Sequence, residues 1–169
     1  MWAYYKEIVA SLACVFTLAG CMQPASDARS TPTATSLERG RYLVQITGCN
    51  DCHTHDYDTN AGKVDEKLWL TGNSLGWQGP WGTTYPPNLR THMQLLTEDQ
   101  WLVEARAREM LPPMPWYYFR VMSEEDLRSI YRFIRSLGPG GEPAPANLPP
   151  GTEPPLPVIK LVAPPGASA

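Results

Sequence analysis

The sequence lacks a long run of positive charge, and it lacks an apolar run of the length that a mature membrane span requires. Its 14 Lys and Arg residues are outnumbered by 17 Asp and Glu residues, which gives a formal net charge of -3. Because nucleic-acid-binding domains usually carry a basic patch or stripe, nucleic acid is not expected as a partner. The one long apolar stretch, residues 8–19, is shorter than the roughly 20 residues that a spanning helix needs.

The alternation of apolar and polar residues that marks a half-buried strand is weak between residues 36 and 138. Two of the four cysteines, Cys14 and Cys21, lie in or at the end of the apolar stretch, so the sequence does not indicate a disulfide framework. Proline is abundant instead, and ten of the 18 prolines fall in residues 139–169. We therefore expect a Pro-rich extended C-terminal tail, whose apolar residues 158–162 pack back on the core as an edge strand.

The N-terminus has the features of an export signal, with a short apolar core followed by a polar stretch. Leu18-Ala19-Gly20-Cys21 resembles the lipobox of bacterial lipoproteins, in which a peptidase cuts before the cysteine and the cysteine is then acylated. We expect residues 1–20 to be a lipoprotein signal peptide, Cys21 to be the lipidated residue and residues 21–35 to be a flexible tether. An ordinary secretory signal and a short helix with a chance cysteine are the alternatives.

Residues 36–138 show helical periodicity and form the predicted compact domain. A first helix is predicted from about residue 37 to residue 48, with Ser36 as its N-cap. Residues 54–96 are predicted to be a long loop, which is unusual in a compact domain without a cofactor or a functional role.

Two further helices have clear start signals. Thr97 stands three residues before Gln100, which is the spacing of a capping box, and helical periodicity follows. Ser123 can cap the last helix, and three acidic residues after it suit the positive end of the helix dipole. Gly138 is a typical C-terminal stop for that helix.

Cys49-Asn50-Asp51-Cys52-His53 has the C-x-x-C-H spacing of covalent haem attachment. Two thiols three residues apart can add to the two vinyl groups on one side of a porphyrin, and the following histidine then reaches the iron as an axial ligand. We therefore expect one covalent haem c, held by Cys49 and Cys52, with His53 on the iron. Large apolar side chains of the 54–96 segment would cover the flat cofactor: Trp69, Trp77, Trp81, Tyr85 and Leu89.

Three other interpretations of the two cysteines stay open. A thioredoxin-like redox pair would need a βαβ setting, which the sequence does not show. A structural zinc site needs four ligands, which only His55 and His92 could complete. A simple disulfide between Cys49 and Cys52 is the third.

Met114 is the expected second axial ligand. It stands in Leu111-Pro112-Pro113-Met114-Pro115-Trp116, where the prolines forbid helix and fix the backbone, so that little ordering entropy is lost on ligation. Met110 and Met122 lie at or near helix positions, where methionine more often fills a gap in the core. The other candidates are Met93, His55 and His92.

The combination of these motifs resembles a class I cytochrome c domain over about residues 36–138, and in particular the cytochrome c domains that accompany bacterial membrane-bound alcohol and aldehyde dehydrogenases. The resemblance rests on residues 48–53, on the loop 112–116 and on the start of the last helix at residues 122–127. It extends to Tyr85-Pro86-Pro87-Asn88-Leu89, a loop that runs beside the haem in such domains.

The resemblance implies an all-α cytochrome c fold of about three to five helices and long loops around one haem. It also implies that Gly40 allows a close approach beneath the last helix, near Tyr131. Those dehydrogenase subunits often contain three haem domains, whereas this chain has a single C-x-x-C-H motif.

The functional hypothesis is a single-haem electron carrier, not itself an enzyme, tethered through Cys21 on the periplasmic side of a bacterial membrane. With both axial positions filled, the iron exchanges electrons with redox partner proteins such as a dehydrogenase, an oxidase or another cytochrome. The alternative is a haem sensor or small peroxidase with an open sixth position. That alternative needs an acid/base group over the iron, for which His92 is the free histidine. A third hypothesis is a haem subunit that serves a larger oxidoreductase.

Overall fold

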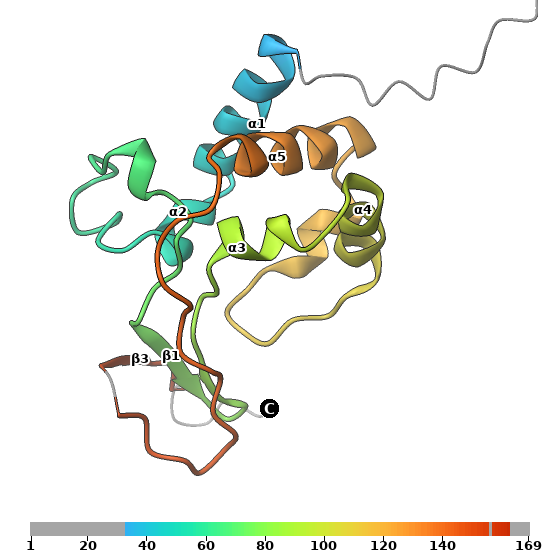
Figure 1. The fold of residues 1–169 in the computed structure, drawn as a ribbon. Helices are drawn as coiled ribbons and strands as arrows, with labels where there is room; N and C mark the ends of the chain where they lie inside the picture. Colours follow the sequence, from blue (N-terminus) through green and yellow to red (C-terminus); the bar gives the residue numbers. More distant parts are fainter. Residues whose placement is uncertain (1–32, 156, 163–169) are drawn as a thin grey trace, which may run out of the picture. The chain divides into compact units, whose positions relative to one another are not determined.

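The structure is a computed structural model that describes residues 33–155 and 157–162. The predicted signal peptide, Cys21 and nearly all of the predicted tether lie outside these residues. The described residues form five α-helices, two short 3-10 helices and three strands (Figure 1), in the order α1 (Ala34–Ile46), α2 (Cys49–His53), η1 (Glu66–Leu68), β1 (Gly76–Gly79), β2 (Gly82–Thr84), α3 (Leu89–Gln94), α4 (Glu98–Ala107), η2 (Trp116–Arg120), α5 (Glu124–Ser136) and β3 (Val158–Lys160). Among the described residues, no helix combines the length and the apolar character that crossing a membrane requires.

Helices α1 and α5 begin at side-chain caps. In α1 the cap is Thr33, whose Oγ1 accepts a hydrogen bond from the Ser36 N–H at 3.2 Å. The prediction of Ser36 as N-cap is therefore wrong, since the helix starts one turn earlier and Ser36 is buried inside it. In α5 the predicted cap is confirmed, because Ser123 Oγ accepts from the Asp126 N–H at 3.1 Å. Gly138, with φ +69°, follows the end of this helix as predicted.

The close approach at Gly40 is present between α1 and α5. A Cβ atom added there would lie 2.0 Å from the carbonyl oxygen of Ser129 and 2.7 Å from Cβ of Phe133. The contact on α5 falls at Ser129 and Phe133, two residues to either side of Tyr131, so the expected approach near Tyr131 is confirmed. Tyr131 itself donates its hydroxyl hydrogen to the Leu96 carbonyl at 2.7 Å, which ties α5 to the turn after α3.

Helix α4 has the predicted capping box. Thr97 Oγ1 accepts from the Gln100 N–H at 3.2 Å, and the Gln100 side chain accepts from the Thr97 N–H at 2.8 Å. The helix packs on α5 through Trp101, whose buried indole N–H donates to the Leu127 carbonyl at 2.9 Å. Its indole also meets the ring of Phe119 edge-on, which joins η2 to the same core.

The segment over residues 54–96, predicted to be a loop, has structure of its own. It contains η1, the hairpin β1–β2 and α3. Trp69, the first of the aromatic residues expected to cover the haem, is buried in the protein core. Its indole N–H donates to the Val64 carbonyl at 2.9 Å. The ring of Trp69 meets those of Tyr57 and Phe133 edge-on, so protein contacts alone account for its burial.

A small sheet in the order β2-β1-β3 stands beside the helices (Figure 1). Strand β1 pairs antiparallel with β2, where Trp77 faces Thr84, and parallel with β3, where Trp77 faces Ile159. Strand β3 confirms the predicted edge strand within residues 158–162, but it pairs with β1 of this sheet and does not pack on the hydrophobic core. The sheet adds strands to a domain that the sequence predicts as all-α.

Candidate functional site

The predicted haem-attachment residues occupy the one-turn helix α2. Gly48, with φ +73°, changes the chain direction after α1 and is the N-cap of α2, which starts at the next residue. A left-handed backbone of this kind is costly for any residue with a side chain. Cys49, Cys52 and His53 are therefore brought together on one short turn, as the sequence predicts.

Cys49 and Cys52 are both free and half-buried. Burial raises the pKa of the Cys49 thiol, against the opposing effect of a 3.3 Å contact with Thr47 Oγ1. Burial also raises the pKa of Cys52, and the negative charge of Asp51 acts in the same direction. Reactive redox cysteines have lowered pKa values, so these thiols differ from a thioredoxin-like pair.

His53 is 6% exposed, and its ring is held by a single hydrogen bond. Nδ1 lies 2.9 Å from the carbonyl oxygen of Pro87. Because a carbonyl can only accept, Nδ1 carries a proton, and in the neutral ring Nε2 then keeps its lone pair. Burial lowers the pKa of His53, which favours the neutral ring that metal ligation requires.

A buried polar network fixes the turn that carries the motif. Asn50, with no exposed surface, accepts from the Thr54 hydroxyl at 2.7 Å. The same Thr54 oxygen accepts from the Leu70 N–H at 2.8 Å. Sequence reasoning names Asn50 and Pro87 within motifs but misses their contacts. Asn50 bonds to Thr54, the C-cap of α2, and Pro87 bonds to His53, which is 34 residues away in the sequence.

Met114 lies half-buried in the turn before η2. Its N–H donates to the Leu111 carbonyl at 3.3 Å, and its own carbonyl accepts from the Trp116 N–H at 2.9 Å. Met114 and Cys49 pack against the same hydrophobic core. Its ligation stays a prediction.

The other axial candidates have different surroundings. Met93 is 1% exposed in the core on α3, where it packs as an apolar residue, and Met110 and Met122 are half-buried against that core. His55 is exposed and bonds to Asn73 at 3.2 Å. His92 has an evident partner in the structure, because Nε2 lies 2.8 Å from the carboxylate of Glu104 on α4.

The alternative cysteine chemistries find little support in the described residues. No strand precedes α2 there, so the βαβ setting of a thioredoxin-like pair is missing. Within the same part of the chain, no three His, Cys, Asp or Glu side chains cluster closely enough to hold a metal ion. A zinc site built from Cys49, Cys52, His55 and His92 is thus not formed.

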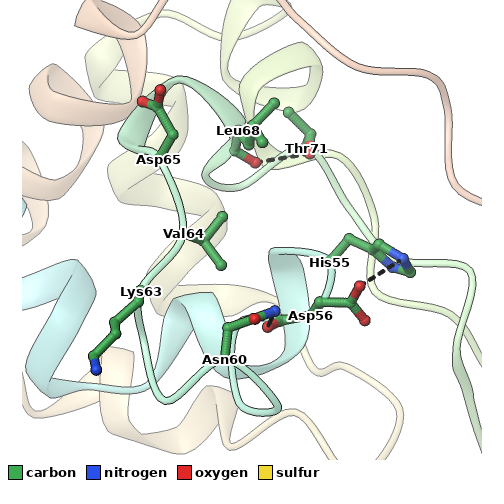
Figure 2. Close-up of a pocket in the computed structure, with 8 residues that line it drawn as sticks. All are labelled: His55, Asp56, Asn60, Lys63, Val64, Asp65, Leu68 and Thr71. Atoms are coloured by element: carbon green, nitrogen blue, oxygen red, sulfur yellow. Dashed lines mark hydrogen bonds and ion pairs between the residues drawn. The ribbon is translucent and has the colours of Figure 1, made fainter.

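A shallow hollow of about 460 Å³ lies outside the motif (Figure 2). Its lining comes from residues 55–71 and mixes charges of both signs, such as Asp56, Lys63 and Asp65. His55 stands at its edge, 3.4 Å from the Asp56 carboxylate. Cys49, Cys52, His53 and Met114 do not line this hollow, so it is separate from the predicted haem site.

Comparison with known proteins gives two relatives, while no protein-family model and no solved structure matches the chain. The chain is 27% identical over 126 residues to a nicotinate dehydrogenase subunit of Pseudomonas putida, covering 68% of this chain and 10% of that protein. It is 27% identical over 157 residues to the fructose dehydrogenase cytochrome subunit of Gluconobacter japonicus, covering 84% of this chain and 30% of that protein. The chain is thus similar to parts of dehydrogenase subunits, one of which is a cytochrome subunit, and it spans less than a third of either relative.

Proposed function

We propose that the chain is a single-haem c-type cytochrome that passes electrons between a dehydrogenase and a further redox partner. One observation carries the proposal: a buried His53 follows two free thiols, and its Nδ1 is bound to the Pro87 carbonyl, which leaves Nε2 for a ligand. Similarity to the fructose dehydrogenase cytochrome subunit supports both the haem and the kind of partner.

The residues present fit a covalently attached haem. Cys49 and Cys52 are unpaired and lie on one turn, where their sulfurs would form two thioethers. His53 would bind the iron through Nε2, with its ring oriented by Pro87. Met114 would supply a thioether from a backbone that its neighbouring prolines constrain.

When bound, haem supplies a one-electron couple at its iron. Ligation by a thioether from Met114 and an imidazole from His53 would raise the reduction potential relative to two imidazoles. If both side chains bind the iron, the chain itself would perform no bond chemistry. The proposal is therefore an electron carrier or haem subunit, and not an enzyme in its own right.

The haem part of the proposal is tested by expression in a bacterial strain that matures c-type cytochromes. Mass spectrometry of the denatured wild-type protein should show one covalent haem adduct. Cys49→Ala and Cys52→Ala should each weaken the attachment, and the double variant should abolish it. Wild-type protein that stays colourless in such a strain would contradict the proposal.

The axial ligands are tested by optical spectra of the oxidised protein. A weak long-wavelength charge-transfer band reports the Met–iron bond, and it should vanish in Met114→Leu but persist in Met110→Leu and Met122→Leu. His53→Ala should lose the low-spin spectrum, and His55→Ala is its control because that ring is exposed. A band that survives Met114→Leu would reject this ligand, and rapid carbon monoxide binding by the wild type would favour the sensor or peroxidase alternative.

The proposal includes export and a lipid anchor at Cys21 on the periplasmic side of a bacterial membrane. The lipobox resemblance of residues 18–21 supports it, and these residues lie outside the described part of the structure. Cys21→Ser should move the protein from the membrane fraction to the soluble fraction, while Cys14→Ser should leave it in place. Equal membrane retention of both variants would contradict lipidation at Cys21.

A further inference from the structure

The first part of the C-terminal tail, up to Leu148, follows the loop that carries Pro87. After α5 the chain runs along residues 83–90 and then reaches the sheet, where β3 joins β1 (Figure 1). Thr83 and Leu148 exchange both of their backbone hydrogen bonds, each at 2.9 Å. The Tyr85 N–H donates to the Asn147 side chain at 2.8 Å.

Two residues that closely follow Pro87 are also bound to the tail. Asn88 caps α3 with its side-chain oxygen and donates from its nitrogen to the Gly140 carbonyl at 2.8 Å. Arg90 is buried, and its guanidinium donates to the carbonyls of Gly138 at 2.7 Å and of Leu137. Among the described residues Arg90 has no acidic partner, so these carbonyls at the end of α5 take the place of a counter-charge.

Pro87 therefore lies between two residues that are hydrogen-bonded to the tail, one before it and one after it in the sequence. Tyr85, two residues before it, is held by Asn147, and Asn88, directly after it, is held by Gly140. The carbonyl of Pro87 is the acceptor for Nδ1 of His53. A chain of contacts thus leads from the tail to the ring of the predicted axial ligand.

We infer that the Pro-rich tail positions the Pro87 carbonyl and thereby tunes the reduction potential set by His53; the inference rests on the proposed haem site. A hydrogen bond from Nδ1–H to a carbonyl raises the basicity of Nε2 and stabilises the oxidised iron. When the tail releases residues 83–88, this bond lengthens and the potential becomes more positive. The tail, although distant from Cys49–His53 in the sequence, would then help to set the reduction potential of the cofactor.

The test uses full-length protein altered only on the tail side. Asn147→Ala/Leu148→Pro removes the acceptor for Tyr85 and the N–H that bonds to Thr83. Asn147→Ala alone is the milder second variant. Ala146→Pro is the control, since residue 146 is exposed and its N–H bonds to no residue in the described part of the chain.

Two measurements are needed, the reduction potential and amide hydrogen exchange over residues 83–88. The inference predicts faster exchange and a more positive potential in the double variant, smaller changes of the same sign in Asn147→Ala, and neither change in Ala146→Pro. Faster exchange with an unchanged potential would overturn it, because the tail would then be structural only. Unchanged exchange would overturn it as well.

Failure of the haem proposal gives a different result. If the wild-type protein carries no haem, nitrogen-15 NMR of the His53 ring still reports which nitrogen is protonated. The wild type should then show the Nδ1–H form, and the double variant should shift toward a mixture of the two forms. A ring that is identical in the two proteins would overturn the inference independently of haem.

Discussion

At the scale of single residues, Gly40 gives the sharpest prediction about packing. Helix propensity alone predicts that Gly40→Ala stabilises α1 by up to about 1 kcal/mol. The added Cβ would lie 2.0 Å from the Ser129 carbonyl oxygen, however, and a backbone atom cannot move aside without displacing α5. We therefore expect a net loss of about 1–3 kcal/mol or more in the free energy of unfolding.

Urea unfolding of the purified protein checks the prediction for Gly40. Glu38→Ala is the control, because Glu38 is exposed on the same helix and its replacement should change stability by less than about 0.5 kcal/mol. A Gly40→Ala protein as stable as the wild type would show that α1 and α5 are farther apart than in the structure.

Thr54 gives a second prediction at this scale, because its hydroxyl serves two buried partners. Thr54→Val keeps the shape of the side chain but leaves Asn50 Oδ1 and the Leu70 N–H without their hydrogen bonds. Each unsatisfied buried group costs about 1–3 kcal/mol, so we expect a loss of at least about 1 kcal/mol in the free energy of unfolding. Thr59→Val, at an exposed threonine, should have little effect, and a loss equal to that of Thr54→Val would reject the explanation.

At the scale of elements, α1 and α5 are also joined by a charge pair. Asp126 Oδ1 accepts from Arg39 at 2.8 Å, and this bond lowers the pKa of Asp126, with Ser123 acting in the same direction. A carboxyl with a lowered folded-state pKa binds fewer protons in the folded chain than in the unfolded chain. Its contribution to stability is therefore present above about pH 4 and is lost as the pH falls through the folded-state pKa.

Asp126→Asn should consequently be less stable than the wild type at neutral pH, and the difference should shrink as the pH falls below about 4. Unfolding curves of both proteins, measured from pH 7 down to the lowest pH at which the wild type is folded, check this pH dependence. Glu125→Gln is the control, because Glu125 is exposed and lies 3.9 Å from its partner Arg132. A stability difference that does not depend on pH would exclude the Arg39–Asp126 pair as its cause.

The elements that the sequence predicts well are those with local signals. Helices α4 and α5 begin at Thr97 and Ser123, because a capping side chain acts within one turn and is visible in the sequence. The predicted start of α1 is misplaced because Ser36 is a good cap by type but is buried within the helix, where its hydroxyl accepts a hydrogen bond from Arg132 of α5.

The elements that the sequence does not reveal are short and depend on distant contacts. Strands β1 and β2 have four and three residues, and the pairing of β1 with β3 joins segments some 80 residues apart. The same limit applies to the site: Cys49, Cys52 and His53 are recognisable from their spacing, whereas the Pro87 acceptor is 34 residues from His53. No local pattern encodes a carbonyl contact across such a distance.

At the scale of the whole molecule, the structure changes the role expected of the haem. The sequence suggests that aromatic residues such as Trp69 need a cofactor to cover, but Trp69 is buried against Tyr57 and Phe133. The pair α1–α5 and the tail contacts are likewise made by protein alone. The haem would therefore order one side of the domain rather than hold all of it together.

This division predicts which part of the chain loosens when haem is absent. Residues 108–122 contain Met114 and make few backbone hydrogen bonds outside η2, whereas α1 and α5 bury a continuous apolar face against each other. In Cys49→Ser/Cys52→Ser, amide exchange should speed up most in residues 108–122 and least in α1 and α5. The wild-type protein with its haem is the reference for the double variant. Met114→Leu, which keeps the thioethers, should speed up exchange in residues 108–122 without affecting α2. Uniform loss of protection along the whole chain would instead make the haem the centre of the entire fold.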